Sequence, residues 1–315
     1  MSDAGLIALA AVARARRSDL ESEALRGHDR ALLQSACDGL LGRALDPMEG
    51  YRVWPRPVEL LLAQWAPLGE SDRVVQLRLN LLLLALAESL PDRLRRSGLP
   101  VPFAEEYRRS ALRITQRIAQ GRRWDHGLQD DVFRKDLALL CLRMLPCVSH
   151  VVCRYSGIPR STLLRPRNLA SGASARVVFA LRGQLRPLIA NHVHPEMTDR
   201  FDPAGREACY RLVCALLGHW PDSAGLVGTS WYYDRVVGDI SPHLAYLRKV
   251  PAERGALFLD VGAPAEARAD AVFRSERRRA RVEDGTYKPR TVMMVWPRQA
   301  LLAHLPRQPA TRAVA

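Results

Sequence analysis

Apolar residues recur at helical spacing through the first half of the chain. Residues 5 to about 45 alternate short apolar stretches with Arg and Glu, and another helix follows with Pro57 at its front. The run ESDRVVQLRLNLLLLALAESLPDRL is apolar almost all round, which is typical of a helix in the middle of a bundle. PFAEEYRRSALRITQRIAQG is amphipathic and should end at Gly121. These patterns predict a helical region over residues 1–155.

One more helix in this half carries boundary signals, and a break in the pattern follows it. Asp130 or Asp131 can cap the start of QDDVFRKDLALLCLRMLPCVSHVVCRYSG. Pro146 should kink or divide this helix, because proline lacks the N–H that a helix interior needs. Residues 156–176 then mix Pro, Gly, Ser and Arg without periodicity, which predicts a linker.

The second half combines strands with helices. Four short stretches have the apolar and aromatic character of strands: PLIANHVH, AGLVGTSWYY, GALFLDVG and RTVMMVWP. DPAGREACYRLVCALLG predicts a helix, with Asp202 as N-cap, Pro203 in the first position and Gly218 past the end. Two further helices are predicted in PAEARADAVFRSERRRARVEDG and PRQALLAHL. The whole is an α+β protein, with an α+β domain over 177–304 and a disordered tail over 305–315.

The charge balance is strongly basic. There are 47 Lys and Arg residues against 33 Asp and Glu, which gives a formal net charge of +14, and only Lys135, Lys249 and Lys288 are lysines. A guanidinium group binds phosphate and carboxylate groups in a fork and stays charged. Anionic partners are therefore attracted from a distance in a salt-dependent way. Charge alone permits contact with nucleic acid but does not require it.

The cysteines and the apolar runs predict a cytoplasmic protein. None of the six cysteines sits in a C-x-x-C pair and most lie in apolar runs, so we expect buried, reduced thiols. The longest apolar run is too short to cross a bilayer. At the N-terminus the positive charge follows the apolar patch, which indicates a first helix and not an export signal. No membrane partner is expected.

The stretch PLIANHVHPEMTDRFDP is the part of the chain where side chains that can bind a metal or transfer a proton are most concentrated. On a strand, alternate side chains share a face, so His192 and His194 would point the same way. Such a pair can clamp iron or zinc, with Glu196 or Asp199 as a third ligand, or supply a general base. Known His-x-His metal patterns place their other ligands at different spacings, which favours the base. The alternative is a polar strand end whose histidines bond backbone groups before the Asp202 cap.

The stretch GLVGTSWYYDRVVGDISPHLAYLRKVP has the composition of a pocket wall. Aromatic rings supply contact area, while hydroxyl groups and Asp234 can orient a polar ligand, so we assign Asp234 to catalysis with the histidines. The alternative is a strand edge that packs its aromatic residues under a loop. The predicted substrate-binding residues are Trp231, Tyr232, Tyr233, Tyr246 and Arg248.

The stretch FRSERRRARVEDGTYKPR concentrates arginine. On a helix four of its side chains fall along one face, which could hold a phosphate-bearing cofactor or the backbone of RNA. The alternative is a solvated face. Neither a P-loop nor a G-x-G-x-x-G turn is present, which disfavours kinases, simple NTPases and dinucleotide enzymes. The predicted donor-binding residues are Arg274, Arg277, Arg278 and Arg281.

Two resemblances bear on function. The blocks GTSWYYD, ISPHLAYLRKVP, RGALFLDVG, SERRRARVEDGTYKP and VWPR resemble, in the same order, a group of uncharacterised bacterial proteins, which implies a grouping without a mechanism. The order of strands and helices over 187–261 is similar to the core of GNAT-type acyltransferases. That family binds coenzyme A on an R/Q-x-x-G-x-G/A turn, whereas RYSGIP keeps Arg154 and Gly157 but has Pro159 in place of a small residue. Relatives that take aminoacyl-tRNA lack the turn, and a basic surface suits them.

Three hypotheses follow from these observations. The first is an acyl- or aminoacyltransferase that moves a group from acyl-CoA or aminoacyl-tRNA to a small acceptor, with His192 or His194 as the base and no metal. The second is an iron or zinc enzyme that uses His192, His194 and Glu196 as ligands. The third is a non-enzymatic basic protein that binds nucleic acid or an acidic partner through its arginines.

Overall fold

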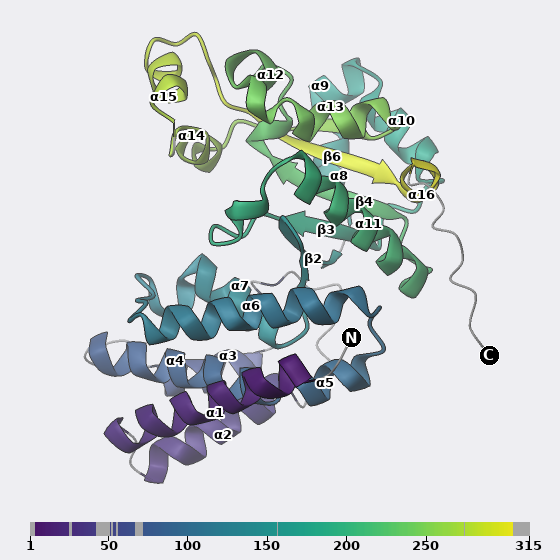
Figure 1. The fold of residues 1–315 in the computed structure, drawn as a ribbon. Coiled ribbons are helices and arrows are strands. Elements are labelled where there is room, and N and C mark those ends of the chain that lie inside the picture. The colour runs from purple at the N-terminus through teal and green to yellow at the C-terminus, as the bar shows by residue number, and fades with distance from the viewer. Residues whose placement is uncertain are drawn as a thin grey trace, which may run out of the picture. The chain divides into compact units, whose positions relative to one another are not determined.

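The computed structural model describes residues 4–24, 27–41, 51, 53–54, 56–66, 72–155, 157–273 and 275–304. The chain divides into two compact units. The first unit consists of Met1–Arg154 together with Val193–Asp199, and the second consists of Tyr155–His192 and Arg200–Ala315. Figure 1 shows that the first unit is built mainly of helices, whereas most strands belong to the second. The predicted α+β class is therefore confirmed.

The first unit is organised around one buried helix, α4 (Asp72–Glu88). Its residues Leu79, Leu81 and Leu82 are fully buried, and so are most of their apolar neighbours in the same helix. Helices α1, α6 and α7 pack against α4. The apolar run around this helix thus has the central position that its pattern predicted. The other α-helices described in this unit are α1 (Ala4–Ala24), α2 (Gly27–Leu41), α3 (Arg56–Trp65), α5 (Leu90–Ser97), α6 (Pro102–Ala119) and α7 (Asp131–Leu140).

The boundaries of α6 and α7 follow their local signals. Asp130 caps α7, because its side chain accepts hydrogen bonds from the backbone N–H groups of Val132 (2.9 Å) and Phe133 (3.0 Å). The chain turns at Gly121, which has a φ of 75° just after α6 ends. These two helices supply most of the polar site described below, so their ends fix its geometry.

The expectation of helices alone up to residue 155 is wrong at its C-terminal end. Helix α7 stops at Leu140, and β1 (Leu145–Cys147) and β2 (His150–Tyr155) form an antiparallel hairpin. Pro146 lies in β1 and does not kink a helix. The hairpin turns through Val148, whose φ of 57° is unusual for a β-branched residue. No Gly or Asn marks this turn, so the sequence gives no turn signal there.

The described residues of the second unit include four strands in the order β3-β4-β6-β5. Strand β3 (Leu188–His192) runs parallel to β4 (Gly225–Ser230), while β6 (Thr291–Pro297) is antiparallel to both β4 and β5 (Leu257–Gly262). All four lie where apolar and aromatic runs predicted strands. Helix α11 (Pro203–His219) packs on this sheet, with the ring of Tyr210 4.9 Å from that of Trp296 in β6. Asp202 caps α11 as predicted, by accepting from the N–H of Gly205 at 2.7 Å.

Shorter helices surround this sheet. The region predicted as one helix over PAEARADAVFRSERRRARVEDG forms two, α14 (Ala265–Val272) and α15 (Glu276–Glu283), and Ser275 caps the second. The predicted last helix is α16 (Arg298–His304), which packs against β4 and β6. The remaining α-helices described in this unit are α12 (Val237–Ile240) and α13 (Tyr246–Glu253), together with α8, α9 and α10.

We expected a linker over 156–176, but the described residues 157–176 form short helices that belong to the second unit. They contain α8 (Arg160–Leu163), α9 (Pro166–Ala170) and the start of α10 (Ala173–Ala180). These helices pack on β5, at the edge of the sheet. The buried Asn168 side chain accepts from the N–H of Asp260 (2.7 Å) and donates to its carbonyl oxygen (2.9 Å). This amide takes the place of a neighbouring strand on an otherwise open edge.

Other expectations concern the thiols, the membrane and the tail. All six cysteines are free, and Cys37, Cys147, Cys153 and Cys209 are buried. Within the described residues no single helix has the length and apolarity to span a membrane; α4 and α5, bent by 48° where they meet, reach that threshold only as a pair. The tail predicted over 305–315 lies outside the described residues.

Candidate functional site

The histidine stretch is split between the two units. Strand β3 ends at His192, which belongs to the second unit, whereas residues 193–199 belong to the first. We call residues 193–199 the anchor segment. Because the strand stops before His194, alternation along a strand does not place the two imidazole rings on one face. The structure therefore does not bring the predicted pair together as a clamp.

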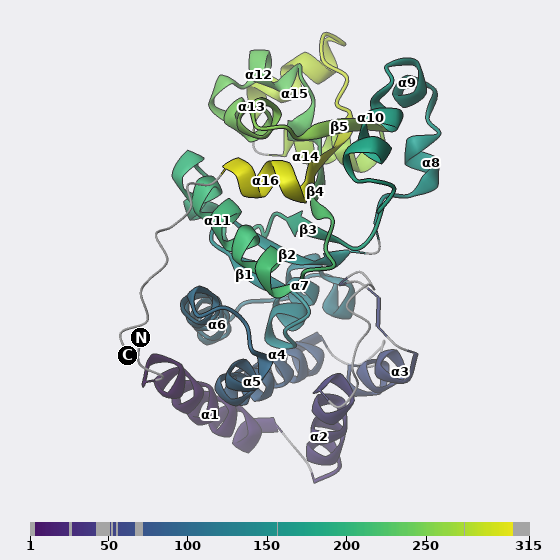
Figure 2. The ribbon, with the colours of Figure 1, turned by 90° about the vertical axis from the view of Figure 1, so that its right-hand side faces the viewer.

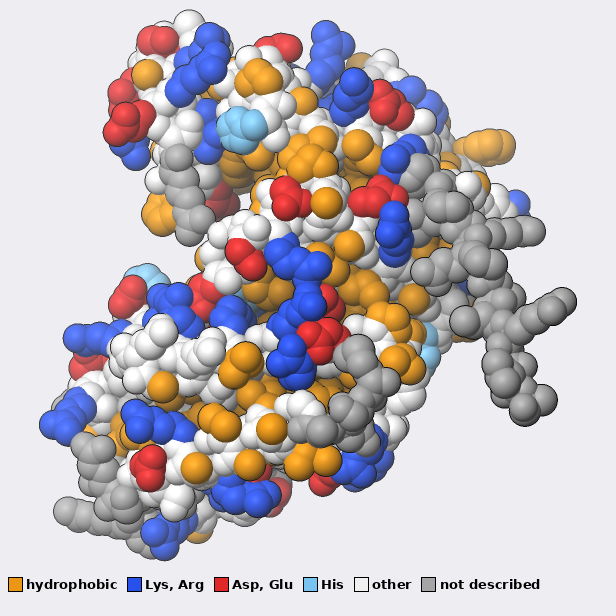
Figure 3. Space-filling model, viewed as in Figure 1, with side chains coloured by type: hydrophobic (Ala, Val, Ile, Leu, Met, Phe, Trp, Pro, Cys, Tyr) orange, Lys and Arg blue, Asp and Glu red, His pale blue; other side chains and the backbone are white. Residues whose placement is uncertain are grey.

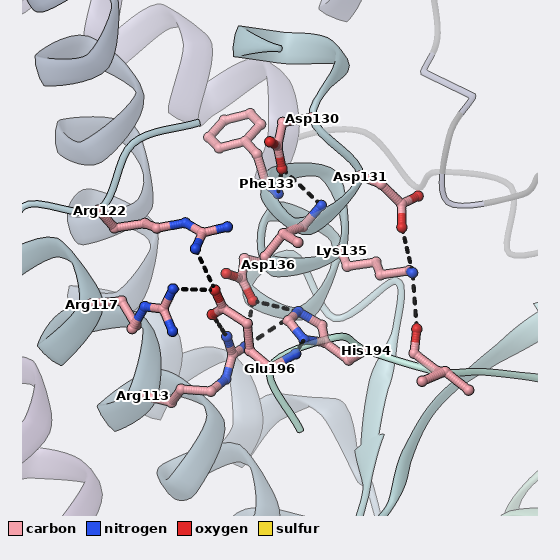
Figure 4. A network of polar contacts seen from close by, with 12 residues as sticks. Arg113, Arg117, Arg122, Asp130, Asp131, Phe133, Lys135, Asp136, His194 and Glu196 are labelled. Carbon is pink, nitrogen blue, oxygen red and sulfur yellow. Dashed lines mark hydrogen bonds and ion pairs between the residues drawn. The ribbon is translucent and has the colours of Figure 1, made fainter. Parts of the chain in front are cut away.

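His194 is buried completely and both of its ring nitrogens are engaged. Its Nδ1 accepts from the backbone N–H of Glu196 at 3.2 Å, so Nε2 carries the hydrogen and donates to Asp136 Oδ1 at 3.0 Å. Figure 4 shows the ring between the anchor segment and Asp136 of α7. Burial lowers the pKa of His194, although Asp136 acts in the opposite direction. The imidazole is thus a neutral, satisfied core group that solvent and a substrate do not reach.

Glu196 joins the anchor segment to helix α6 and the turn after it. Its carboxylate pairs with Arg113 at 2.8 Å, Arg117 at 2.7 Å and Arg122 at 3.1 Å. Arg113 also pairs with Asp136, which makes one connected network (Figure 4). Burial by itself raises the pKa of Asp136, but Arg113 and His194 outweigh it, so that the pKa is lowered. The Asp136 carboxyl group is ionised and committed to its partners.

A lysine completes the attachment of the anchor segment. Lys135 Nζ donates to the carbonyl oxygen of Val193 at 2.9 Å and pairs with Asp131 at 2.5 Å. The Asp131 carboxylate in turn accepts from the hydroxyl of Tyr51 at 2.7 Å. Together these contacts hold residues 193–196 at three points, which is the arrangement of a structural anchor and not of an open catalytic centre.

The residues predicted as ligands for iron or zinc do not form a metal site in the described structure. Glu196 is taken up by arginines, and His192 and His194 lie in different units. In the ranges that the structure describes, no group of three or more His, Cys, Asp and Glu side chains is placed to hold a metal ion. The other candidate ligand, Asp199, is exposed at the end of the anchor segment.

The predicted pocket wall is largely core. Tyr232 and Tyr233 are buried in a short turn after β4, and the Tyr233 hydroxyl accepts from Arg206 at 2.6 Å. Arg206 is itself buried in α11 and also donates to Tyr210 at 2.8 Å. With its amide oxygen toward the guanidinium, Asn191 of β3 accepts twice more from Arg206 at 2.9 Å. This cluster ties α11, β3 and the turn together, in line with the packing alternative for these rings.

The other predicted residues of this group contact nearby backbone groups or a side chain from another helix. Tyr246 donates its hydroxyl hydrogen to the carbonyl oxygen of Phe201 at 3.1 Å. Asp234 accepts from the N–H of Val236 at 3.3 Å and is half-buried. The guanidinium carbon of Arg278 lies over the Trp231 ring, 4.7 Å from the centre of that ring. The structure thus joins one member of the predicted pocket to one member of the predicted arginine face.

The arginines predicted on one face of a helix differ in exposure where the structure describes them. Arg277 and Arg281 are exposed on α15, and Arg274 lies outside the described residues. Arg278 is buried, where it donates to Ser241 Oγ at 3.1 Å and to the carbonyl oxygen of Ala271. Its guanidinium holds α14 and α15 to the unit, so Arg278 is not available on an exposed face of the helix.

The sequence interpretation missed a second stretch of the chain that is rich in exposed arginine. We call residues 160–186, with α8, α9 and α10, the basic segment; Figure 2 shows these helices next to one another. No Asp or Glu occurs anywhere between Asp136 and Glu196. This absence of acidic residues could have indicated a basic region from the sequence, but we interpreted residues 156–176 as a linker. The exposed arginines of the segment are Arg160, Arg165, Arg167, Arg176, Arg182 and Arg186.

Elsewhere many of the basic side chains have acidic neighbours. Figure 3 shows Lys and Arg side chains spread over the visible face with Asp and Glu among them. On α6, for example, Glu105 pairs with Arg108 at 2.8 Å and with Arg109 at 3.0 Å. By contrast, within the described part of the chain none of the six exposed arginines of the basic segment forms an ion pair with a carboxylate.

The basic segment also exposes apolar side chains. Phe179 is 86% exposed, Leu164 67% and Leu169 53%. Arg176 and Phe179 are three residues apart on α10, so their side chains are neighbours on the helix surface. Unpaired cations beside an exposed ring are the features with which proteins hold phosphates and bases together.

The chain was compared with protein-family models, with curated proteins and with solved structures, and none of the three comparisons found a match.

Proposed function

We propose that the second unit binds single-stranded nucleic acid through the basic segment. The observation that carries this proposal is the set of six exposed arginines on a stretch of chain without any carboxylate. Cations with no internal counter-charge gain most from contact with a regularly spaced anion, and the nucleic-acid backbone is such an anion. The third hypothesis from the sequence is therefore favoured, on a surface other than the one expected.

The exposed apolar side chains favour a single strand over a duplex. A single strand offers its bases for stacking on rings such as that of Phe179, while the bases of a duplex are already stacked. An anionic membrane surface also attracts basic and apolar residues together. Membrane-surface helices present a continuous apolar face, however, and α8, α9 and α10 have only four, five and eight residues.

The hypothesis of an acyl- or aminoacyltransferase has less support. The first hypothesis needs a base that reaches a substrate, and both nitrogens of His194 are occupied in a buried network. His192 belongs to a different unit from His194, at the end of β3. The proposal is therefore limited to binding, for which the basic segment suffices.

Salt-dependent binding tests this proposal. We would measure the affinity of the full chain for a fluorescent single-stranded RNA of about 16 nucleotides at increasing KCl. For a single strand the slope of log K against log salt is about −0.7 per phosphate contact, so six contacts give roughly −4. The variant Arg160→Gln, Arg167→Gln, Arg182→Gln should reduce the slope by about 2. Phe179→Ala should weaken binding about 5- to 150-fold at constant salt, because a stacked base is lost.

A charge-matched variant provides the control. Arg95→Gln, Arg96→Gln, Arg123→Gln removes the same charge from exposed sites in the first unit and should leave the slope unchanged. Equal effects of the two triple variants would overturn the proposal, because binding would then depend on net charge alone. Binding to vesicles that contain phosphatidylserine, without binding to RNA, would also overturn it.

A further inference from the structure

A cavity beside the basic segment has a composition that the single-strand surface does not explain. It lies between α10, α13 and β5 within the second unit and has a volume of about 230 Å³. Two of its lining residues are arginines from different helices and the others are apolar. Its lining residues are Ala173, Arg176, Arg248, Ala256, Leu257 and Phe258.

Arg248 is fixed in place in the wall of this cavity. Its guanidinium donates to the carbonyl oxygen of Tyr233 and lies 3.9 Å from the centre of the Phe258 ring. Burial lowers the pKa of Arg248, and the charge of Asp234 offsets only part of this effect. In the described residues no carboxylate forms an ion pair with it. A half-buried cation without a paired anion is stabilised by an anionic ligand.

Arg176 connects the cavity to the basic segment. It is exposed on α10, contributes to the wall of the cavity and stands three residues before Phe179. Ala173, the first residue of α10, also lines the cavity, so the positive end of this helix adds to the favourable potential for an anion. A strand held by the basic segment would therefore pass close to the cavity.

The size and charge of the cavity indicate one end of a ligand. Pockets that enclose whole cofactors measure about 300–1,000 Å³, and this cavity is smaller. Two guanidinium groups match the charge of a terminal phosphate monoester, which is about −1.5 to −2, better than that of a singly charged phosphodiester. The apolar lining suits the carbon atoms of the attached sugar.

We infer that this cavity binds the terminal phosphomonoester of the nucleic-acid strand, between Arg176 and Arg248. The inference rests on the proposed function, because the rest of the strand lies on the basic segment. It adds a preference for strands that end in phosphate, which a surface of exposed arginines alone does not provide.

End-modified oligonucleotides test the inference. Three RNAs of one sequence would be compared by fluorescence anisotropy with the full chain: one with a 5′-phosphate, one with a 3′-phosphate, and one with hydroxyl groups at both ends. We expect one phosphate-ended RNA to bind about ten-fold more tightly than the hydroxyl-ended RNA, because two charge-assisted contacts are added. Arg248→Gln should lower this ratio to about one. Arg235→Gln, which removes an exposed cation outside the cavity lining, should leave the ratio unchanged.

The outcomes separate the inference from the proposed function. If hydroxyl-ended RNA binds and neither terminal phosphate improves binding, the inference is overturned while the proposed function stands. If no RNA binds, both are overturned. A free nucleoside monophosphate is a second source of the same group: if it binds through Arg248 and the RNA ends have no effect, the assignment to a strand end is overturned.

A further variant guards against misfolding. Arg248 contacts Tyr233 and Phe258, so its replacement can disturb the fold, which circular dichroism would reveal. Arg176 is exposed, and Arg176→Gln should also lower the ratio between phosphate-ended and hydroxyl-ended RNA. A ratio that stays at ten in both folded variants would overturn the inference.

Discussion

Replacing Glu196 with glutamine removes a negative charge that three arginine side chains share. The amide has nearly the same shape as the carboxylate, so the perturbation is mainly electrostatic. Arg113, Arg117 and Arg122 converge on this group at 2.7–3.1 Å and would then repel one another across a neutral side chain. The anchor segment would lose its strongest attachment to α6.

The expected loss of stability follows from the burial of the network. Removing one partner of a buried ion pair costs about 3–5 kcal/mol. The Glu196 side chain is only 8% exposed, but those of Arg117 and Arg122 are 34% and 27% exposed and can be solvated by water. Arg113 retains Asp136. We therefore expect the low end of that range, roughly 3 kcal/mol, which corresponds to a decrease in Tm of about 6–12 °C for a domain of this size.

Urea unfolding and hydrogen exchange would measure this loss. Unfolding followed by circular dichroism gives the free energy of unfolding, and exchange shows whether protection is lost in the anchor segment and in α6 and α7. Glu105→Gln is a matched control, because Glu105 also pairs with two arginines, at the surface of α6. Surface pairs contribute about 0–1 kcal/mol, so this control should change stability little.

Two results would refute this reasoning. A loss below about 1 kcal/mol for Glu196→Gln would show that the three arginines find adequate solvation without the carboxylate. An equal loss for Glu105→Gln would show that burial does not distinguish the two carboxylates. Either result would remove the basis for describing residues 193–199 as an anchor.

Two further predictions concern the histidine and the sheet edge. Because burial lowers the pKa of His194, the unfolded chain takes up a proton at a higher pH than the folded protein does. The free energy of unfolding should therefore decrease as the pH falls below about 6.5. His194→Gln should remove this part of the pH dependence, which urea unfolding at pH 5 and pH 7.5 would measure. Asn168→Ala should lower the free energy of unfolding by about 3 kcal/mol, because backbone groups of Asp260 lose their hydrogen-bond partners. The control Ser171→Ala, at an exposed site, should change it by nearly nothing. Equal stability of the two variants would contradict the role of Asn168 at the edge of β5.

The candidate site shows where local reasoning stops. The sequence marked His194 as an unusual residue, and it does lie in a dense polar network. Its partner Asp136 is 58 residues away in the chain, and no local pattern links the two residues. Whether an imidazole is an open base or a satisfied core group depends on such distant partners. The same holds for Tyr233, whose partner Arg206 is buried in another helix.

The sequence by itself determined the elements whose causes are local. The apolar circumference of α4, the caps at Asp130 and Asp202, and the apolar runs of β3 to β6 each depend on residues within a few positions. Only the tertiary structure decided which arginines are buried, because burial depends on what packs against each side chain. Thus Arg278 is enclosed while Arg176 faces solvent beside a cavity. It also showed that residues 157–176 cover the edge of β5, a contact that the sequence could not indicate because Asp260, the partner of Asn168, lies 92 residues away.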